Sequence, residues 1–280
     1  MTLVLVVRHG LTATTGVALT GWTPGISLDD RGRAQAAALG ARLAGLPLDA
    51  IITSPLERCV ETAEAIASAR HPARAFGGAS TSGTASGHVP PNGQEPADGQ
   101  EQADGQEQAD GQELAVDGPV VTPQEDARLG ECRYGDWTGQ PLKRLAADPL
   151  WRVVQAHPSA VRFPGEDGES MLDMQNRAVD AVRDWNRRLG HNATYLICSH
   201  GDVIKAILAD SLGLHLDMCQ RIQVDPCSLS VIRYTPLRPF LLRMNDTGGD
   251  VAGLRKPPGQ RSKAAARGEA DAQVGGGAGG

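Results

Sequence analysis

The sequence is poor in aromatic residues and has no long hydrophobic run. Aromatic residues make up 4% of the 280 residues, so a core must be built mainly from Val, Leu, Ile and Ala. The first apolar run, from Thr2 to Val7, ends at Arg8 and is too short for a signal peptide. No stretch approaches the roughly 20 apolar residues of a membrane span. We therefore expect a soluble, cytoplasmic protein with no membrane partner.

Paired cysteine motifs are also missing. The five cysteines are odd in number and scattered, with no Cys-x-x-Cys pair, which predicts reduced thiols and neither a disulfide framework nor a zinc site. Asp202 stands close to His200 but has no further ligand at a metal-binding spacing. We expect no metal and no cofactor.

The acidic balance of the chain comes from one segment. The formal net charge is −6, but residues 92–117 carry eight acidic residues and no basic ones, which leaves +2 for the rest of the chain. A nearly neutral remainder argues against binding to nucleic acid or to an anionic membrane.

The same segment contains a short-period repeat. Residues 94–99, 100–105 and 106–111 are near copies, and 112–118 are a degenerate fourth copy. So polar a repeat cannot offset its own ordering entropy, which predicts a disordered insertion over 71–118, either passive or partner-binding. A tail over 247–280, rich in Gly, Ala and basic residues, is also predicted to be disordered, so the folded domain would comprise 1–246 without the insertion.

Strand and helix patterns alternate along the remaining chain. Buried strands are predicted at Leu3–Val7, Ala50–Thr53, Tyr195–Cys198 and Leu229–Tyr234, and a further run lies at Phe240–Met244. Helical spacing is found at Ala36–Leu46, Met171–Leu189 and Val203–Leu212. Ser54 and Pro55 are read as the cap and first residue of another helix that continues to about Ala69. This alternation is typical of an α/β fold with a mostly parallel central sheet.

Three predicted strands end in cationic or potentially cationic side chains. Arg8, His9 and Gly10 follow the first strand, and Ser199, His200 and Gly201 follow the third. Arg58 falls in the first turn of the helix after the second strand. Each feature alone fits an ordinary solvated, capping or packing role. Because ligands of open α/β sheets bind at the carboxyl ends of the strands, the three together predict an anion pocket.

These motifs resemble the histidine phosphatase (phosphoglycerate mutase-like) superfamily, and most of all its probable-phosphomutase subgroup. The resemblance rests on Arg8–Gly10, Ser54–Ala63, Ser199–Gly201, an acid/base loop at Arg128–Gly139 and the element Gly168–Ser170. It covers about 1–70 and 120–246, and it implies a three-layer sandwich with helices on both faces of the sheet.

The resemblance also implies residue roles. His9 would be the nucleophile that becomes phosphorylated, and Glu131 would be the general acid and then the general base. The phosphoryl oxygens would be held by Arg8, Arg58, His200, Thr15 and Gly201, and substrate would meet Thr20 and Gly21. Thr15 stands where the family often has Asn, so we expect a weaker phosphate contact there.

Two enzymatic functions and one non-catalytic function are open. The preferred function is hydrolysis of a small phosphorylated metabolite through phosphohistidine, and the alternative is a phosphomutase of the phosphoglycerate mutase type. A non-catalytic phospho-ligand binding module would be expected to have lost at least one residue of the catalytic set. That set is present in full and comprises Arg8, His9, Arg58, Glu131 and His200. The partner is therefore a small-molecule phosphoester; the oligomeric state stays open.

Overall fold

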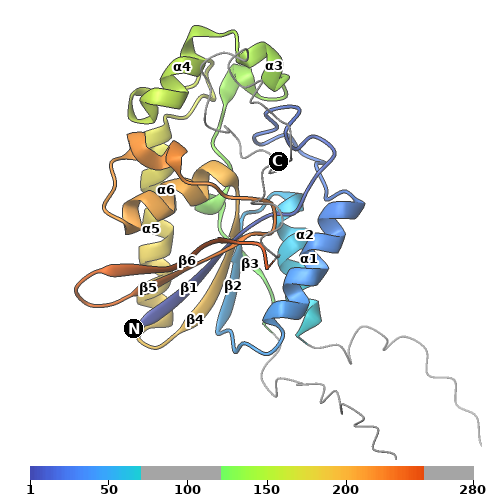
Figure 1. The fold of residues 1–280 in the computed structure, drawn as a ribbon, viewed down its shortest axis with the longest axis vertical. Coiled ribbons are helices and arrows are strands. Elements are labelled where there is room, and N and C mark those ends of the chain that lie inside the picture. Colours follow the sequence, from blue (N-terminus) through green and yellow to red (C-terminus); the bar gives the residue numbers. More distant parts are fainter. Residues whose placement is uncertain (71–120, 249–280) are drawn as a thin grey trace, which may run out of the picture.

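A six-stranded sheet forms the centre of the molecule (Figure 1). The computed structural model describes residues 1–70 and 121–248. The strands are β1 (Thr2–Arg8), β2 (Ala50–Thr53), β3 (Gln124–Glu125), β4 (Thr194–Ser199), β5 (Leu229–Tyr234) and β6 (Pro239–Asp246), in the spatial order β3-β2-β4-β1-β5-β6.

The sheet is mostly parallel, as predicted. Strands β3, β2, β4 and β1 pair in parallel, whereas β5 runs antiparallel to both β1 and β6. Each of the four buried strands predicted from apolar runs lies within one residue of its predicted bounds. Because β1, β2 and β4 are parallel neighbours, the residues that follow them meet at one edge of the sheet.

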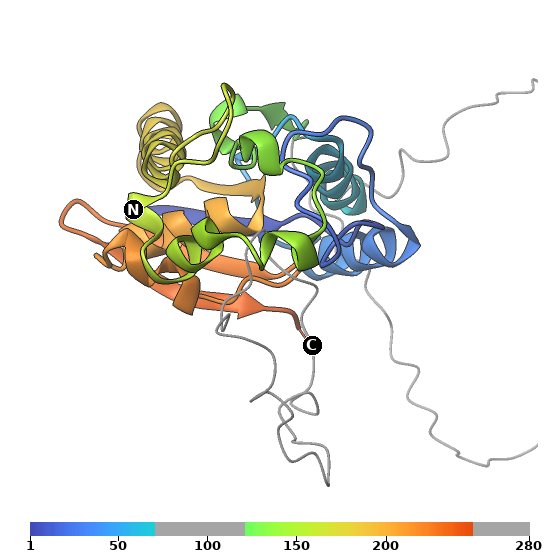
Figure 2. The ribbon, with the colours of Figure 1, turned by 90° about the horizontal axis from the view of Figure 1, so that it is seen from above.

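Helices cover both faces of the sheet, which confirms the three-layer sandwich (Figures 1 and 2). Helices α1 (Asp30–Leu43) and α2 (Glu57–Ala69) pack on one face, where Leu39 and Ile66 meet Leu5 and Leu196. Helices α5 (Met171–Leu189) and α6 (Gly201–Ser211) lie on the other face in a larger core. Trp151 and Trp185, predicted to be core residues, are both buried there.

Two predicted helix boundaries are wrong. Helix α1 ends at Leu43 and not at Leu46, because Gly45 and Pro47 follow directly and neither favours a continuing helix. Helix α2 begins at Glu57 with Leu56 in the cap position, so Ser54 is not its N-cap. The Ser54 hydroxyl instead contacts His200 and accepts a hydrogen bond from the backbone of Leu56.

Short elements between β3 and α5 form the rim above the sheet edge. They are η2 (Ala127–Leu129), η3 (Gly135–Trp137), α3 (Leu142–Leu145), α4 (Pro149–Ala156) and η4 (Pro158–Ala160), and η5 (Leu216–Arg221) follows α6. The predicted insertion at 71–118 and the tail from 249 onward lie outside the described residues. In the part that is described, no helix has the length and hydrophobicity needed to cross a bilayer.

Candidate active site

The side chains that follow β1 and β4 meet at the carboxyl edge of the sheet. The rings of His9 and His200 lie 5.2 Å apart between centroids, with an interplanar angle of 60°. The parallel pairing of Arg8 with Ser199 places the two histidines at the same level of the sheet. The structure therefore brings together two motifs that are 191 residues apart in the sequence.

His9 is held as a neutral ring with one defined tautomer. Its Nδ1 lies 2.7 Å from the carbonyl oxygen of Gly10, which can only accept a hydrogen bond, so Nδ1 carries the proton and Nε2 keeps its lone pair. Burial lowers the pKa of His9 well below its usual value, and the positive charges of Arg58 and Arg8 lower it further. A neutral imidazole with a free Nε2 is the form that can act as a nucleophile.

Two arginines lie buried beside this ring. Arg8 and Arg58 are each 1% exposed. Arg8 donates from Nη1 to the carbonyl of Val224 at 2.8 Å, and Arg58 donates from Nη2 to the carbonyl of Gly21 at 2.9 Å. Within residues 1–70 and 121–248, Nε and Nη1 of Arg58 have no hydrogen-bond acceptor. Buried, unmatched donors on a permanent cation are suited to the oxygens of a phosphoryl group.

His200 is fully buried and its two ring nitrogens are engaged by protein groups. Arg58 can only donate, so the 3.3 Å contact from its Nη2 makes Nδ1 of His200 the acceptor. Nε2 then carries the proton and donates to the hydroxyl of Ser54 at 2.7 Å. Burial lowers the pKa of His200 well below its usual value, followed by the charge of Arg58 and the nearby His9. The ring is therefore neutral beside these protein groups.

Glu131 is a buried carboxyl group at the same edge. Its Oε1 accepts a hydrogen bond from the backbone of Cys132 at 2.9 Å, and its Oε2 lies 3.9 Å from Nδ1 of His200. Burial raises the pKa of Glu131 to about 7, and the charge of Asp202 adds to the rise, while Arg58 opposes it. At neutral pH a large share of this carboxyl is protonated, which a proton donor requires.

Arg177 and Trp22 hold the Glu131 loop, a role that was predicted from the sequence for neither residue. Arg177 donates to the carbonyls of Arg128, Gly130 and Glu131 at 2.6 to 3.0 Å and pairs with both oxygens of Glu169. The indole of Trp22 donates to the same Glu131 carbonyl at 2.5 Å. The sequence carries a signal for Arg177. It lies three residues after Met174 and four before Ala181, so it stands as a charged residue on the apolar stripe of α5.

A second group of buried polar residues lies next to the site. Asp202 accepts a 2.9 Å hydrogen bond from the hydroxyl of Tyr134, and its other oxygen lies 3.7 Å from Nζ of Lys205. All three side chains are buried. The structure describes no cluster of three or more potential metal ligands within its residue ranges.

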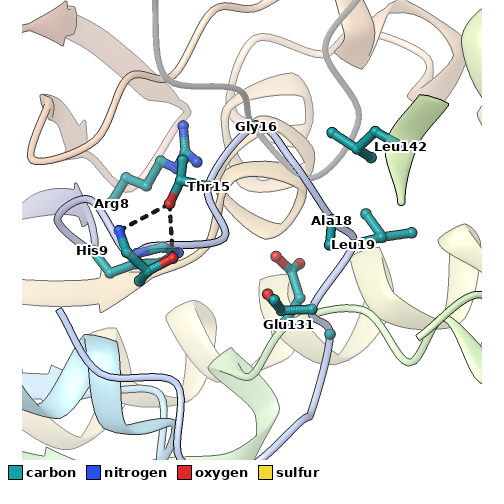
Figure 3. Close-up of a pocket in the computed structure, with 11 residues that line it drawn as sticks. Arg8, His9, Thr15, Gly16, Ala18, Leu19, Glu131 and Leu142 are labelled. Carbon is teal, nitrogen blue, oxygen red and sulfur yellow. Dashed lines mark hydrogen bonds between the residues drawn. The ribbon is translucent and has the colours of Figure 1, made fainter. Parts of the chain in front are cut away.

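A pocket opens at this edge, with Glu131 between its two sides in the view of Figure 3. Its lining residues are Arg8, His9, Thr12, Thr15, Gly16, Ala18, Leu19, Thr20, Gly21, Glu131 and Leu142. Most of the predicted site residues are thus brought together around one cavity. Arg58, His200 and Gly201 are not among the lining residues, and all three are buried.

Thr15 reaches the pocket but is already hydrogen bonded. Its hydroxyl accepts from the backbone of Thr12 at 3.0 Å and lies 2.9 Å from the Thr12 hydroxyl, as the dashed lines in Figure 3 show. Thr20 and Gly21, predicted to meet substrate, line the same pocket. Gly21 has a φ of 51°, and a β-carbon there would meet the ring of Tyr134 at 3.1 Å.

A match to a known protein family identifies the superfamily of this chain. The model of the histidine phosphatase superfamily (branch 1) matches residues 4–75 and 111–247. The chain belongs to this superfamily. The interruption of the match, at 76–110, falls inside the predicted insertion. The match includes His9, Arg58, Glu131 and His200.

Individual relatives fit both activities predicted from the sequence. The probable phosphoglycerate mutase GpmB of Yersinia pestis (strain Pestoides F) is 28% identical over 148 residues, which are 51% of this chain and 67% of that protein. Among solved structures, the phosphoserine phosphatase of Entamoeba histolytica, in complex with 3-phosphoglyceric acid, is 20% identical with a TM-score of 0.63, covering 88% of this chain and 98% of its own. The mycobacterial glucosyl-3-phosphoglycerate phosphatase is 19% identical with a TM-score of 0.61, covering 87% and 98%. The solved structures share the fold of this histidine phosphatase superfamily member.

Proposed function

We propose that the protein is a phosphomonoesterase that hydrolyses a small phosphorylated metabolite through a phosphohistidine at His9. One observation carries this proposal above the others. His9 presents a neutral ring whose Nδ1 is fixed by the Gly10 carbonyl, and it lies beside the buried cations Arg8 and Arg58. A nucleophile within an anion-binding cluster is what phosphoryl transfer asks of a protein.

In the first half-reaction, Nε2 of His9 attacks phosphorus and the bond from phosphorus to the ester oxygen breaks. Arg8 and Arg58 hold the non-bridging oxygens, with His200, Thr15 and Gly201 as further contacts. The approach of a phosphate dianion favours the protonated form of His200. Glu131 gives its proton to the leaving oxygen, so the alcohol departs neutral.

In the second half-reaction, water replaces the alcohol. Glu131, now a carboxylate, takes a proton from water as its oxygen attacks the phosphorus of phospho-His9. The N–P bond breaks, inorganic phosphate forms, and both His9 and Glu131 return to their starting states. One residue serves as acid and then as base because a pKa of about 7 leaves both forms accessible at neutral pH.

Turnover assays with p-nitrophenyl phosphate test the proposal. We expect phosphate release by the full chain and loss of at least about 10³-fold in kcat for His9→Ala. His157→Ala is the matched control, because His157 is exposed and is not among the residues that line the pocket. Full turnover by His9→Ala would refute the proposal.

A phosphomutase is the second candidate, favoured by the likeness to a probable phosphoglycerate mutase and by Thr20 and Gly21 in the pocket wall. The two activities share the first half-reaction and differ in whether the alcohol is rephosphorylated. Incubation with 3-phosphoglycerate separates them, since isomer exchange indicates a mutase and phosphate release alone indicates a phosphatase. Binding of phosphate with neither reaction would indicate the non-catalytic module.

We further propose a cytoplasmic location and no nucleic-acid or membrane partner. All five cysteines are free and buried, in keeping with a reducing compartment. Fractionation of cells that produce the full chain would test the location, and recovery in a membrane fraction would oppose it.

A further inference from the structure

The pocket has two chemically different sides. Arg8, His9 and Thr15 form a polar side, and Leu19 and Leu142 stand on the other (Figure 3). Ala18 lies beside Leu19 on that second side, and Glu131 lies between the two sides in this view. If the phosphoryl group binds at the polar side, the alcohol that leaves faces Leu19 and Leu142, with Thr20 and Gly21 also in the lining.

Backbone pairing holds together the two segments that form the apolar wall. Ala18 bridges Pro141 in antiparallel fashion, and the Leu142 backbone donates to the carbonyl of Val17 at 2.9 Å. The Leu19 backbone donates to the carbonyl of Gln140 at 3.0 Å. Two segments more than 100 residues apart are therefore joined, and each contributes a leucine to the wall.

No second cation faces this wall among the described lining residues. Arg8 is the single Lys or Arg in the lining that the structure describes. Lys143 and Arg144 follow Leu142 but are exposed, and Arg144 donates to Gln140. The guanidinium of Arg133 stacks on the ring of Trp22, with 4.2 Å from Cζ to the centroid. A carboxylate on the leaving alcohol would be desolvated without a partner, and close to the Glu131 carboxyl.

From this wall we infer that the preferred substrates are phosphomonoesters of uncharged, largely apolar alcohols, and not phosphorylated carboxylic acids. The inference rests on the proposed function, since it assumes that the phosphoryl group lies against His9. This substrate class excludes phosphoserine and phosphoglycerate, both of which carry a carboxylate.

A matched pair of substrates tests the inference. Benzyl phosphate and 4-carboxybenzyl phosphate have similar leaving groups and differ in one distant carboxylate. We expect kcat/KM to be at least about tenfold higher for benzyl phosphate, equivalent to about 1.4 kcal/mol in transition-state stabilisation. A ratio of one or below overturns the inference while leaving the proposed hydrolysis intact. No phosphate release from either compound overturns the proposed function itself and the inference with it.

Variants of the wall locate the cause of the preference. Leu142→Arg supplies the missing cation and should reduce the ratio of the two kcat/KM values to about threefold or less. Because Leu142 also packs on the core, Ala18→Arg is a second variant with the same expectation. Val17→Arg is the control, since its side chain is 63% exposed and outside the lining, and it should keep the full ratio. A ratio unchanged in both wall variants would overturn the assignment of specificity to this wall.

Discussion

The Tyr134 hydroxyl donates a 2.9 Å hydrogen bond to Oδ2 of Asp202, and both side chains are 1% exposed. This pair keeps a second buried carboxyl group near Glu131, where its charge raises the pKa of Glu131. Burial is the larger cause of the rise in the pKa of Glu131, and the hydrogen bond from Tyr134 holds Asp202 in the position from which its charge adds to that rise. The acid of the proposed reaction is thus tuned by a residue that does not line the pocket.

The pH dependence of kcat/KM should show this tuning. Glu131 must be protonated to release a poor leaving group, so kcat/KM for an alkyl phosphate should fall as the pH rises through about 7, by up to about tenfold per pH unit. His9 stays neutral well below pH 6.5, because burial and two arginines lower its pKa. The fall should be much weaker for p-nitrophenyl phosphate, whose leaving group needs little protonation. An alkaline limb of equal steepness for both substrates would argue against Glu131 as the acid.

Replacement of Asp202 should move that alkaline limb. Asp202→Asn removes a negative charge that raises the pKa of Glu131, so the fall in kcat/KM should begin at lower pH. Asp210→Asn on the same helix is the matched control and should leave the limb in place. A merely structural role for Asp202 would lower kcat/KM at every pH without a shift. Thermal unfolding of Asp202→Asn and Asp210→Asn measures any loss of stability, and so separates a structural role of Asp202 from its effect on the pKa of Glu131.

Glu131→Gln should separate catalysis from binding. The amide keeps the shape of the side chain but can neither give nor take a proton, so kcat should fall by about 10²–10⁴-fold. The inhibition constant of vanadate, a phosphate analogue, should change by only a few fold. Glu125→Gln, an exposed carboxylate on β3, serves as control. Equal losses of turnover and of vanadate binding would remove the acid/base role.

Arg177→Lys should loosen the Glu131 loop. A lysine cannot reproduce the five hydrogen bonds that the guanidinium makes to three carbonyls and Glu169, so we expect kcat to fall by about 10- to 100-fold. Amide exchange over 128–133 should become faster. Arg183→Lys, more exposed on the same helix, should have neither effect. Unchanged exchange in Arg177→Lys would show that Trp22 alone positions the loop.

The sequence predicted the strands well because buried parallel strands are continuous apolar runs. It predicted the meeting of His9 with His200 because both follow such runs. The predicted N-cap of α2 was wrong because a serine before a proline can either cap a helix or bind a distant side chain. The contact of the Ser54 hydroxyl with His200 could not be predicted from local spacing. Long-range partners decide what such a residue does.

The supporting residues were harder to predict. Arg177 acts on the carbonyl of Glu131, 46 residues away, and backbone carbonyls have no sequence signature. Asp202 drew attention only as a metal ligand, although its partner is Tyr134 in the acid/base loop. The apolar wall of the pocket likewise depends on pairing between two distant segments.

Trapping of the phosphoenzyme tests the central claim most directly. The full chain is mixed with a ³²P-labelled phosphomonoester, quenched in denaturant at alkaline pH, digested and mapped by mass spectrometry. The account predicts an acid-labile phosphoryl group on the peptide that contains His9, absent from His9→Ala and present in His157→Ala. Rapid turnover with no label on His9, or label retained by His9→Ala, would contradict it.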